Sequence, residues 1–170
     1  MQDNQSQTQW IYAAAIMDSD GCFMISRYKR GSRYDYLPNV KVSMINDGSI
    51  NYIHTKTGLG YIHIIGTRKS RPNSLPIYEW RITRKNDLIT FINGIMPYLQ
   101  NKKARAEHLL SFCEKGNYAE KKDAKCYRLS KEELDYREQA YQKMRELNAN
   151  KVGATTKSLG PEKACDSLIS

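Results

Sequence analysis

The chain has 170 residues, which is enough for one domain with a buried core and too few for two ordinary domains. Its 27 Lys and Arg residues outnumber its 18 Asp and Glu residues, giving a formal net charge of +9 and a pI near 9.4. Such an excess on one small domain favours a polyanionic partner, because each phosphate that a basic side chain neutralises releases counterions. The alternative is a basic surface that serves only solubility.

The cysteines and histidines form no recognisable metal or redox motif. The four cysteines are scattered without a CxxC pair, and the three histidines lack the spacing of metal ligands. The polar start MQDNQSQTQ does not resemble a signal peptide, and no apolar run approaches membrane-spanning length. We therefore expect an intracellular protein with reduced thiols and no membrane partner.

Hydrophobic periodicity and turn residues predict nine elements in the order αββαββααα. Helices are expected over residues 8–17, 47–57, 101–114 and 130–147. One more helix is expected between the second and third of these, starting at an Asn86 or Asp87 cap and ending before Pro97. Strands are expected over residues 22–30, 39–46, 60–69 and 77–83. Residues 31–38 are expected to form a turn-rich loop, and a last short helix can follow Pro161.

Several local signals set the ends of these helices. Residues 1–6 are predicted to be disordered, and a Ser6-x-x-Gln9 capping box precedes the first helix. Gly58 suits the position after the second helix, and Ser130-x-x-Glu133 is a capping box for the last one. The third helix is expected to turn Leu88, Ile89, Ile92 and Ile95 inward.

The strands alternate strongly, which predicts an α+β domain with one antiparallel sheet. Val40, Val42 and Met44 share one face of the second strand. Ile62 and Ile64 share one face of the third strand, and Tyr78, Trp80 and Ile82 share one face of the fourth. Helices must cover this apolar face, while the opposite face is polar and basic. Such a face fits the major groove of DNA, although charges that prevent edge pairing would explain the pattern too.

Two acidic residues stand where the first helix ends. Asp18 and Asp20 face the negative end of the helix dipole, which disfavours each carboxylate by roughly 0.3–1 kcal/mol. A hard cation such as Mg²⁺, which prefers carboxylate and carbonyl oxygens, is the simplest reason for this placement, and phosphodiester cleavage by a metal-bound water would follow. A plain turn before Gly21 is the alternative.

Residues 13–21, AAAIMDSDG, resemble the LAGLIDADG signature of homing endonucleases and related maturases. Ala14, Asp18, Asp20 and Gly21 match the signature, whereas Ala13 and Ala15 replace its usual leucine and glycine. The resemblance implies the αββαββα homing-endonuclease fold, with a saddle-shaped antiparallel sheet and, here, additional C-terminal helices. It extends in outline over residues 8–157, with an endonuclease domain at residues 7–147 and a DNA-contacting loop and tail at 148–170.

This resemblance implies a site-specific, intron-encoded endonuclease that cuts both strands of a long pseudo-palindromic DNA across the minor groove. The implied cofactor is Mg²⁺ or another divalent cation such as Mn²⁺, and the implied location is the cytoplasm or nucleoid of a prokaryote or an organelle. The family's metal ligand corresponds to Asp20, joined by the carbonyl of Ser19, while Asp18 would cap the helix end.

Two further catalytic residues follow from the same resemblance. The segment SMIN implicates Asn46 as the amide that positions solvent, and MPYLQNKK implicates Lys102 (or Lys103) as the residue that stabilises transition-state charge. The basic residue expected one turn into the next helix is absent, since Ile50 and Asn51 stand there, and His54 can take its role.

A single signature per chain implies a homodimer, and cutting two strands needs two sets of acids. The expected dimer interface comprises Trp10, Ala13, Ala14 and Met17. Each sheet would contact a half-site of about ten base pairs, or one helical turn, so the DNA target spans about two turns.

The DNA-binding residues are expected on the polar sheet face, in the two hairpins and in the C-terminal segment. They are Met24, Ser26, Tyr28, Arg30, Arg33, Tyr34, Asn39, Lys41, Ser43, Tyr61, His63, Arg68, Glu79, Arg81, Lys151, Thr155 and Lys157. A frayed terminus is the alternative for the last three.

Two other functions remain open at the level of sequence. One is a nucleic-acid-binding module that does not cleave, such as an RNA maturase or a transcriptional regulator on the same fold. The other is a structural basic protein such as a ribosomal component, which would bind RNA without dimerisation or metal.

Overall fold

The computed structural model describes residues 3–31, 33–65, 75–115 and 129–149. In chain order the elements are α1 (Asp3–Ser19), β1 (Cys22–Arg30), β2 (Arg33–Met44), α2 (Asp47–Thr57), β3 (Tyr61–Ile65), β4 (Ile77–Ile82), α3 (Lys85–Ile95), the short 3-10 helix η1 (Met96–Tyr98), α4 (Lys103–Lys115) and α5 (Lys131–Ala149). The predicted α+β class and the order αββαββααα are confirmed, with η1 inserted after α3. Within the described residues, no helix is both long and apolar enough to cross a membrane.

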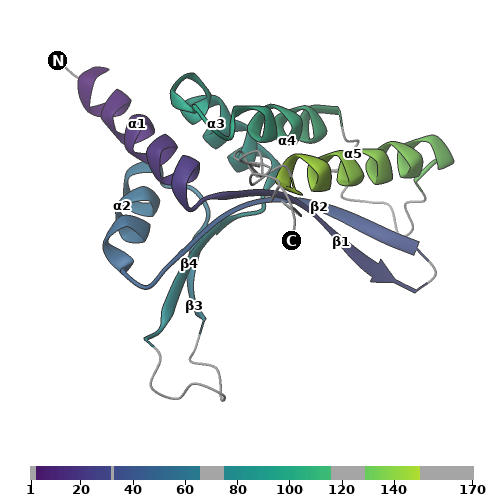
Figure 1. Ribbon diagram of the computed structural model, residues 1–170, viewed down its shortest axis with the longest axis horizontal. Coiled ribbons are helices and arrows are strands. Elements are labelled where there is room, and N and C mark those ends of the chain that lie inside the picture. The colour runs from purple at the N-terminus through teal and green to yellow at the C-terminus, as the bar shows by residue number, and fades with distance from the viewer. Residues whose placement is uncertain (1–2, 32, 66–74, 116–128, 150–170) are drawn as a thin grey trace, which may run out of the picture.

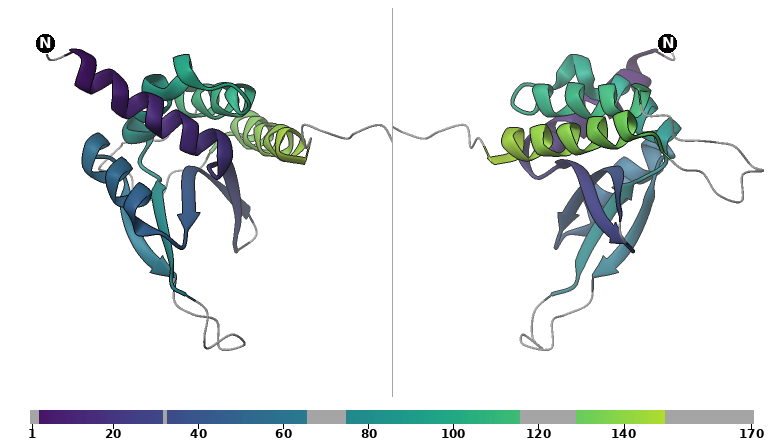
Figure 2. Two further views of the ribbon diagram at one scale, coloured as in Figure 1. Left: turned by 60° about the vertical axis from the view of Figure 1, so that its left-hand side comes forward. Right: turned by 90° about the vertical axis from the view of Figure 1, so that its right-hand side faces the viewer.

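The four strands form one antiparallel sheet in the order β1-β2-β4-β3. Figure 1 shows the sheet as an arch, with the helices on its convex side and the two hairpins reaching away from them. Both views in Figure 2 agree that the described helices leave the inner side of the arch open. We call this open side the concave face.

The core lies between the convex face of the sheet and the helices. Strand residues that alternate toward the helices, such as Phe23, Val42 and Trp80, have no exposed surface. Trp80 contacts Phe91 of α3 edge to face at 5.0 Å, and its indole N–H donates to the Leu59 carbonyl at 2.9 Å. The period-two pattern therefore assigned the buried face of the central strands correctly.

Several local predictions are confirmed in detail. Helix α2 has the predicted bounds, and Gly58 after it adopts φ 66° and donates its N–H to the His54 carbonyl. The hydroxyl of Ser130 accepts the N–H of Glu133 at 3.2 Å, as the capping box predicted.

Other predictions were wrong at the ends of elements. Helix α1 begins at Asp3, so residues 3–6 are helical and not disordered, and the helix starts three residues before Ser6. The expected loop over residues 31–38 belongs largely to β2, because strand pairing continues to the Arg30 and Arg33 pair. Tyr36 is buried in this part of the hairpin, and its burial outweighs the turn-forming composition.

Helix α3 and strand β3 also differ from the prediction. Arg84 is the N-cap of α3 and makes no side-chain capping bond, so neither Asn86 nor Asp87 caps the helix. Phe91 is fully buried in α3, whereas Ile89 is only partly buried. Ile64 is 59% exposed, although it lies on the face that the pattern assigned to the core. The expected last part of β3 and the helix after Pro161 lie outside the described residues.

Candidate active site and nucleic-acid interface

The end of α1 turns directly into β1, and this junction carries the candidate metal ligands. The N–H groups of Asp20 and Gly21 both donate to the Ile16 carbonyl, at 2.9 and 3.1 Å, which closes the last turn. The Asp20 carboxylate is exposed and accepts the Ser19 hydroxyl at 3.0 Å. A Cβ at Gly21 would lie 2.6 Å from Cα of Met17, so this close turn requires glycine.

Lys102 places its ammonium group against the same junction. Its Nζ donates to the carbonyls of Met17, Ser19 and Gly21 at 2.9, 3.0 and 2.8 Å. A cation is favoured at the negative end of a helix dipole. Burial, and next the charge of Arg105, lower the pKa of Lys102 below its usual value of 10.5, while Cys22, Asp18 and Asp20 act in the opposite direction.

Asp18 holds the segment that delivers Lys102. Its carboxylate accepts the backbone N–H groups of Gln100, Asn101 and Lys102 at 2.7, 3.2 and 3.0 Å. The prediction that Asp18 caps the end of its own helix is therefore wrong. Asp18 instead binds the backbone of the segment that leads into α4. The two ion-dipole contacts, Asp18 with Gln100–Lys102 and Lys102 with the end of α1, lock these segments together.

Asn46 has a local structural role. Its side-chain oxygen accepts the N–H of Gly48 at 2.8 Å and so caps α2. The residue is exposed, and among the described residues no hydrogen bond joins it to the end of α1. His54, the other basic candidate, lies half-buried in the last turn of α2.

The oxygen donors at the end of α1 fit part of the coordination shell of a hard cation. Asp20 supplies an exposed carboxylate, and the Ser19 carbonyl retains a second lone pair beside its bond from Lys102. Within the part of the chain that the structure describes, no cluster of three or more Asp, Glu, His or Cys side chains could hold a metal. Any cation at Asp20 must complete its shell with water, phosphate oxygens or a second chain.

The concave face carries most of the predicted DNA-binding residues. Alternation and strand register place the following on it: Met24, Ser26, Tyr28, Arg30, Arg33, Asn39, Lys41, Ser43, Tyr61, His63, Glu79 and Arg81. Tyr28 and Tyr61 are 52% and 45% exposed, which makes them available to a partner. Arg68, Lys151, Thr155 and Lys157 lie outside the described residues.

Three of the predicted DNA contacts need correction. Tyr34 lies on the opposite side of the hairpin, where its ring stacks on Arg27 at 4.6 Å, and Arg27 bonds Glu138 of α5. Asn39 is 5% exposed and donates to the Ser26 hydroxyl at 2.9 Å, and Glu79 is 1% exposed. Neither side chain can reach a partner directly. Alternation identified the face of Asn39 and Glu79 but not the neighbours that cover them.

The predicted dimer residues are also mostly internal. Ala13, Ala14 and Met17 have no exposed surface within a single chain, so they have none to bury against a second copy. Trp10 is half-buried against Phe91 at a ring distance of 6.2 Å. The exposed stripe of α1 instead contains Ile11, Tyr12 and Ala15.

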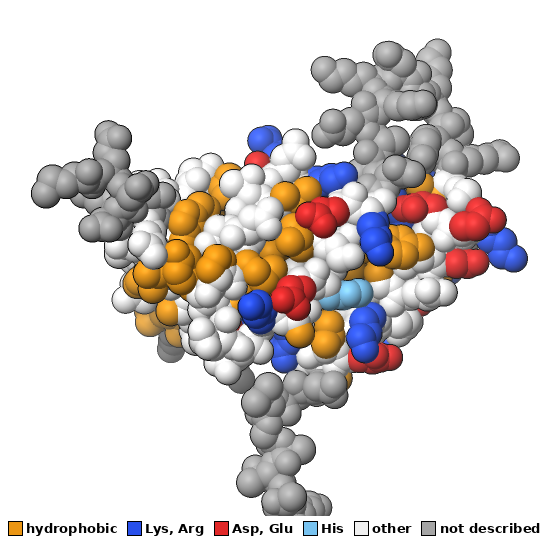
Figure 3. Space-filling model, turned by 90° about the horizontal axis from the view of Figure 1, so that it is seen from above, with side chains coloured by type: hydrophobic (Ala, Val, Ile, Leu, Met, Phe, Trp, Pro, Cys, Tyr) orange, Lys and Arg blue, Asp and Glu red, His pale blue; other side chains and the backbone are white. Residues whose placement is uncertain are grey.

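Figure 3 looks onto the helical layer and shows apolar side chains gathered toward the end where α1 lies. Charged side chains dominate toward the other end, where α4 and α5 lie. On α1, Ile11 is 47% exposed and Tyr12 is 37% exposed. Tyr12 also contacts α2, through a 2.9 Å hydrogen bond with Ser49 and an edge-to-face contact with Tyr52.

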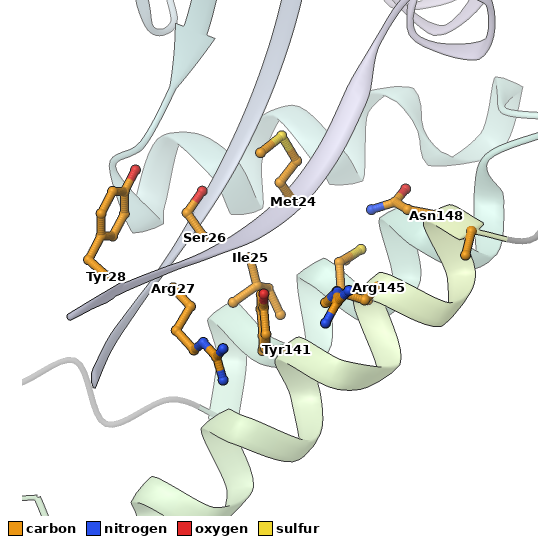
Figure 4. A pocket seen from close by; sticks show the side chains of 10 residues that line it. Met24, Ile25, Ser26, Arg27, Tyr28, Tyr141, Arg145 and Asn148 are labelled. Atoms are coloured by element: carbon orange, nitrogen blue, oxygen red, sulfur yellow. The ribbon is translucent and has the colours of Figure 1, made fainter. Parts of the chain in front are cut away.

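A pocket of about 620 Å³ lies between the edge strand β1 and the second half of α5. Figure 4 shows Tyr141 and Arg145 of α5 beside Ile25 and Arg27 of β1. Asn148 donates to the Phe23 carbonyl at 3.0 Å and so satisfies one group of the sheet edge. Sequence reasoning missed these α5 residues, although positions 141, 145 and 148 share one face of a helix.

Comparison with known proteins supports the fold. No protein-family model matches the sequence, and no curated protein matches it either. Among solved structures, the homing endonuclease I-CvuI in complex with DNA superposes with a TM-score of 0.68 at 20% identity, covering 87% of each chain. The LAGLIDADG homing endonuclease I-GzeII has a TM-score of 0.59 at 20% identity, covering 81% of this chain and 43% of that one.

The archaeal intron-encoded homing endonuclease I-Vdi141I is similar as well, with a TM-score of 0.55 at 14% identity and a coverage of 84% of this chain and 98% of that one. These neighbours are LAGLIDADG homing endonucleases. The chain therefore has the LAGLIDADG homing-endonuclease fold, and the predicted saddle-shaped sheet is confirmed.

Proposed function

We propose that this protein is a site-specific endonuclease that cuts both strands of a duplex DNA with the help of a divalent cation. The observation that carries the proposal is the position of Asp20, an exposed carboxylate where α1 meets the open, concave sheet. The homing endonucleases I-CvuI and I-GzeII, which share this fold, were solved in complex with DNA targets, and the I-CvuI complexes were determined in the presence of magnesium or calcium. The net charge of +9 suits the same partner.

In this proposal the concave face binds the major groove of one half-site of about ten base pairs. Asp20 and the Ser19 carbonyl would hold Mg²⁺ or Mn²⁺, which supplies an activated water and neutralises charge on the phosphate. Lys102 keeps the Ser19 carbonyl and the end of α1 in position. Asn46 caps α2 through its side-chain oxygen and keeps both amide N–H groups, with which it could orient a water molecule.

Cleavage of two strands requires a second active site, which we assign to a second copy of the chain. The exposed stripe with Ile11 and Ala15 lies on α1, the helix that ends at Asp20. Packing two α1 helices along this stripe would bring both Asp20 residues toward one two-fold axis. I-GzeII agrees with this arrangement in length, since this chain covers 43% of that one and leaves room there for a second unit.

The cleavage test uses a library of partly randomised duplexes, incubated with the purified full chain and Mg²⁺, from which cut ends are recovered. Asp20→Asn should abolish cutting while binding is retained, because the amide cannot hold the cation but keeps the shape of the side chain. Asp135→Asn is the matched control, since Asp135 is an exposed acid on α5. Cutting that persists in Asp20→Asn would contradict the assignment, and binding without cutting by the unaltered protein would indicate a non-cleaving module.

The dimer test compares Ala15→Glu with Gln139→Glu by analytical ultracentrifugation. Both positions are exposed, but Ala15 lies on α1 one turn from Ile11, whereas Gln139 lies on α5. A buried like-charge pair across a two-fold axis should shift the first variant to monomer and leave the second dimeric. A monomeric unaltered protein would contradict the proposed pairing.

A further inference from the structure

The carboxylate of Glu79 lies buried at the centre of the concave face, where the partner would be expected to bind. Glu79 belongs to β4, an inner strand of the sheet, and its side chain is 2% exposed. A buried carboxylate is costly unless it is paired and hydrogen-bonded, so its neighbours must supply charge and donors.

Side chains from three strands bind this carboxylate. Oε2 accepts the Lys41 ammonium at 3.3 Å and the Ser43 hydroxyl at 2.9 Å. Oε1 accepts Nη2 of Arg81 at 2.5 Å and lies 3.6 Å from Nε2 of His63. Each oxygen of the Glu79 carboxylate therefore has two neighbouring polar side chains.

The ionised form of Glu79 is the stable one. Burial by itself raises the pKa of Glu79, but the hydrogen bond from Ser43 and the charges of Lys41 and Arg81 outweigh it and hold the pKa below its usual value of 4.5. Two cations share one carboxylate, so this cluster carries a single net positive charge where its basic residues alone would carry two.

Lys41 and Arg81 still reach the surface of the concave face. Their side chains are 31% and 30% exposed, and strand register places them directly opposite each other. Each retains N–H donors beyond the one that Glu79 accepts. Within the described part of the chain, Nε of Arg81 is a buried atom without a hydrogen-bond partner, so this conformation does not use all donors of the guanidinium group.

We propose that Glu79 is a specificity-determining positioning residue, which orients Lys41 and Arg81 toward the acceptors of a guanine base and offsets part of their attraction to phosphates. This inference rests on the proposed DNA-binding function. Guanine offers two adjacent acceptors, N7 and O6, in the major groove, which suit Arg and Lys donors. Glu79 acts through these two side chains and does not touch the base.

The carboxylate gives selectivity because it competes with any other acceptor. Phosphates are spaced along the whole DNA backbone, and each one can bind a free basic side chain whatever the base sequence. Lys41 and Arg81, held at fixed positions by Glu79, can donate fully only to acceptors that match those positions. Removal of the carboxylate charge should free both side chains to follow the backbone.

The experiment compares Glu79→Gln with the unaltered protein by selection from a library of random-sequence duplexes, followed by binding of one selected and one random duplex across salt concentrations. We expect discrimination at one G·C pair to fall from about tenfold or more to below threefold. Affinity for the random duplex should rise, and the slope of log K against log salt should steepen by about 0.9, the effect of one additional phosphate contact.

Glu138→Gln is the matched control, because it makes the same change in net charge at an arginine pair on the convex side of the hairpin. It should leave the base preference unchanged. In the Lys41→Met and Arg81→Met double-variant background, Glu79→Gln should no longer alter that preference, because Glu79 acts through these two side chains.

A base preference and salt slope that stay unchanged in Glu79→Gln would overturn the role of Glu79. An unaltered protein that binds no duplex would instead overturn the proposed function. If Glu79→Gln fails to fold, Ser43→Ala tests the same cluster by removing one donor to Oε2. It should reduce discrimination about threefold without changing the salt slope, and unchanged discrimination would overturn the inference.

Discussion

Asp18 gives the sharpest test of how the end of α1 is built. Its carboxylate accepts three backbone N–H groups, from Gln100, Asn101 and Lys102, across more than 80 positions of sequence. In Asp18→Asn the side chain keeps its shape but loses its charge and one acceptor atom. We therefore expect the variant to fold with a weakened clamp on the segment that carries Lys102.

The magnitude follows from these three bonds. Hydrogen bonds to a charged group contribute about 1.5–3 kcal/mol each, neutral ones about 0.5–1.5, and a buried donor left without a partner costs about 1–3. Bonds that share one carboxylate are not additive, so we expect a total loss of about 2–4 kcal/mol. For a chain of this length the melting temperature should fall by about 5–15 °C.

The assay is urea unfolding at pH 7 without divalent cations, with the midpoint compared at constant slope. Asp35→Asn is the control, because it makes the same change at the hairpin. There the half-buried Asp35 pairs with the exposed Arg30 and Arg33 at 3.5 and 3.8 Å. Exposed pairs of this kind contribute about 0–1 kcal/mol. An equal shift of the midpoint in both variants would refute the clamp.

Two further predictions concern Lys102 and Glu138. Lys102→Met should lower the free energy of unfolding by about 1–3 kcal/mol, because three carbonyls at the end of α1 lose their cation, and it should also lower cleavage. Lys103→Met is the control, since Lys103 is the exposed neighbour. Equal stability of the two variants in urea would contradict the contact. Hydrogen bonds from Tyr36, Gln142 and Arg27 hold the pKa of Glu138 below its usual value of 4.5 against the effect of burial, with Tyr36 the largest contributor. Folding therefore favours the ionised carboxylate, so its contribution is complete above pH 4.5 and is lost as the pH falls through the lowered pKa. Thermal melts should show Glu138→Gln less stable than the unaltered protein at pH 7 and the difference shrinking toward pH 3, whereas a constant difference would contradict this pairing.

The sequence predicted most of the fold because its signals are local. Alternation in β1, β2 and β4 and the caps at Gly58 and Ser130 each depend on residues a few positions apart. The boundaries failed where distant contacts decided them. Residues 33–38 form a strand because they pair with β1 and bury Tyr36, which no local pattern indicates.

The candidate site divides in the same way. Two acids at a helix end before a glycine were visible in the sequence, and so was the polar face of the sheet. The partners of those groups were not. Asp18 binds Gln100–Lys102, Lys102 binds the Ser19 carbonyl, and Ala13 and Ala14 face the core of their own chain.

Sequence periodicity by itself determined which residues share a face of a helix or strand, because backbone geometry fixes that relation within each element. The tertiary structure alone decided which faces are covered and by what. Glu79 alternates as a surface residue, yet Lys41, Ser43 and Arg81 enclose it. Burial depends on side chains from several elements at once, and these meet only when the whole chain has folded.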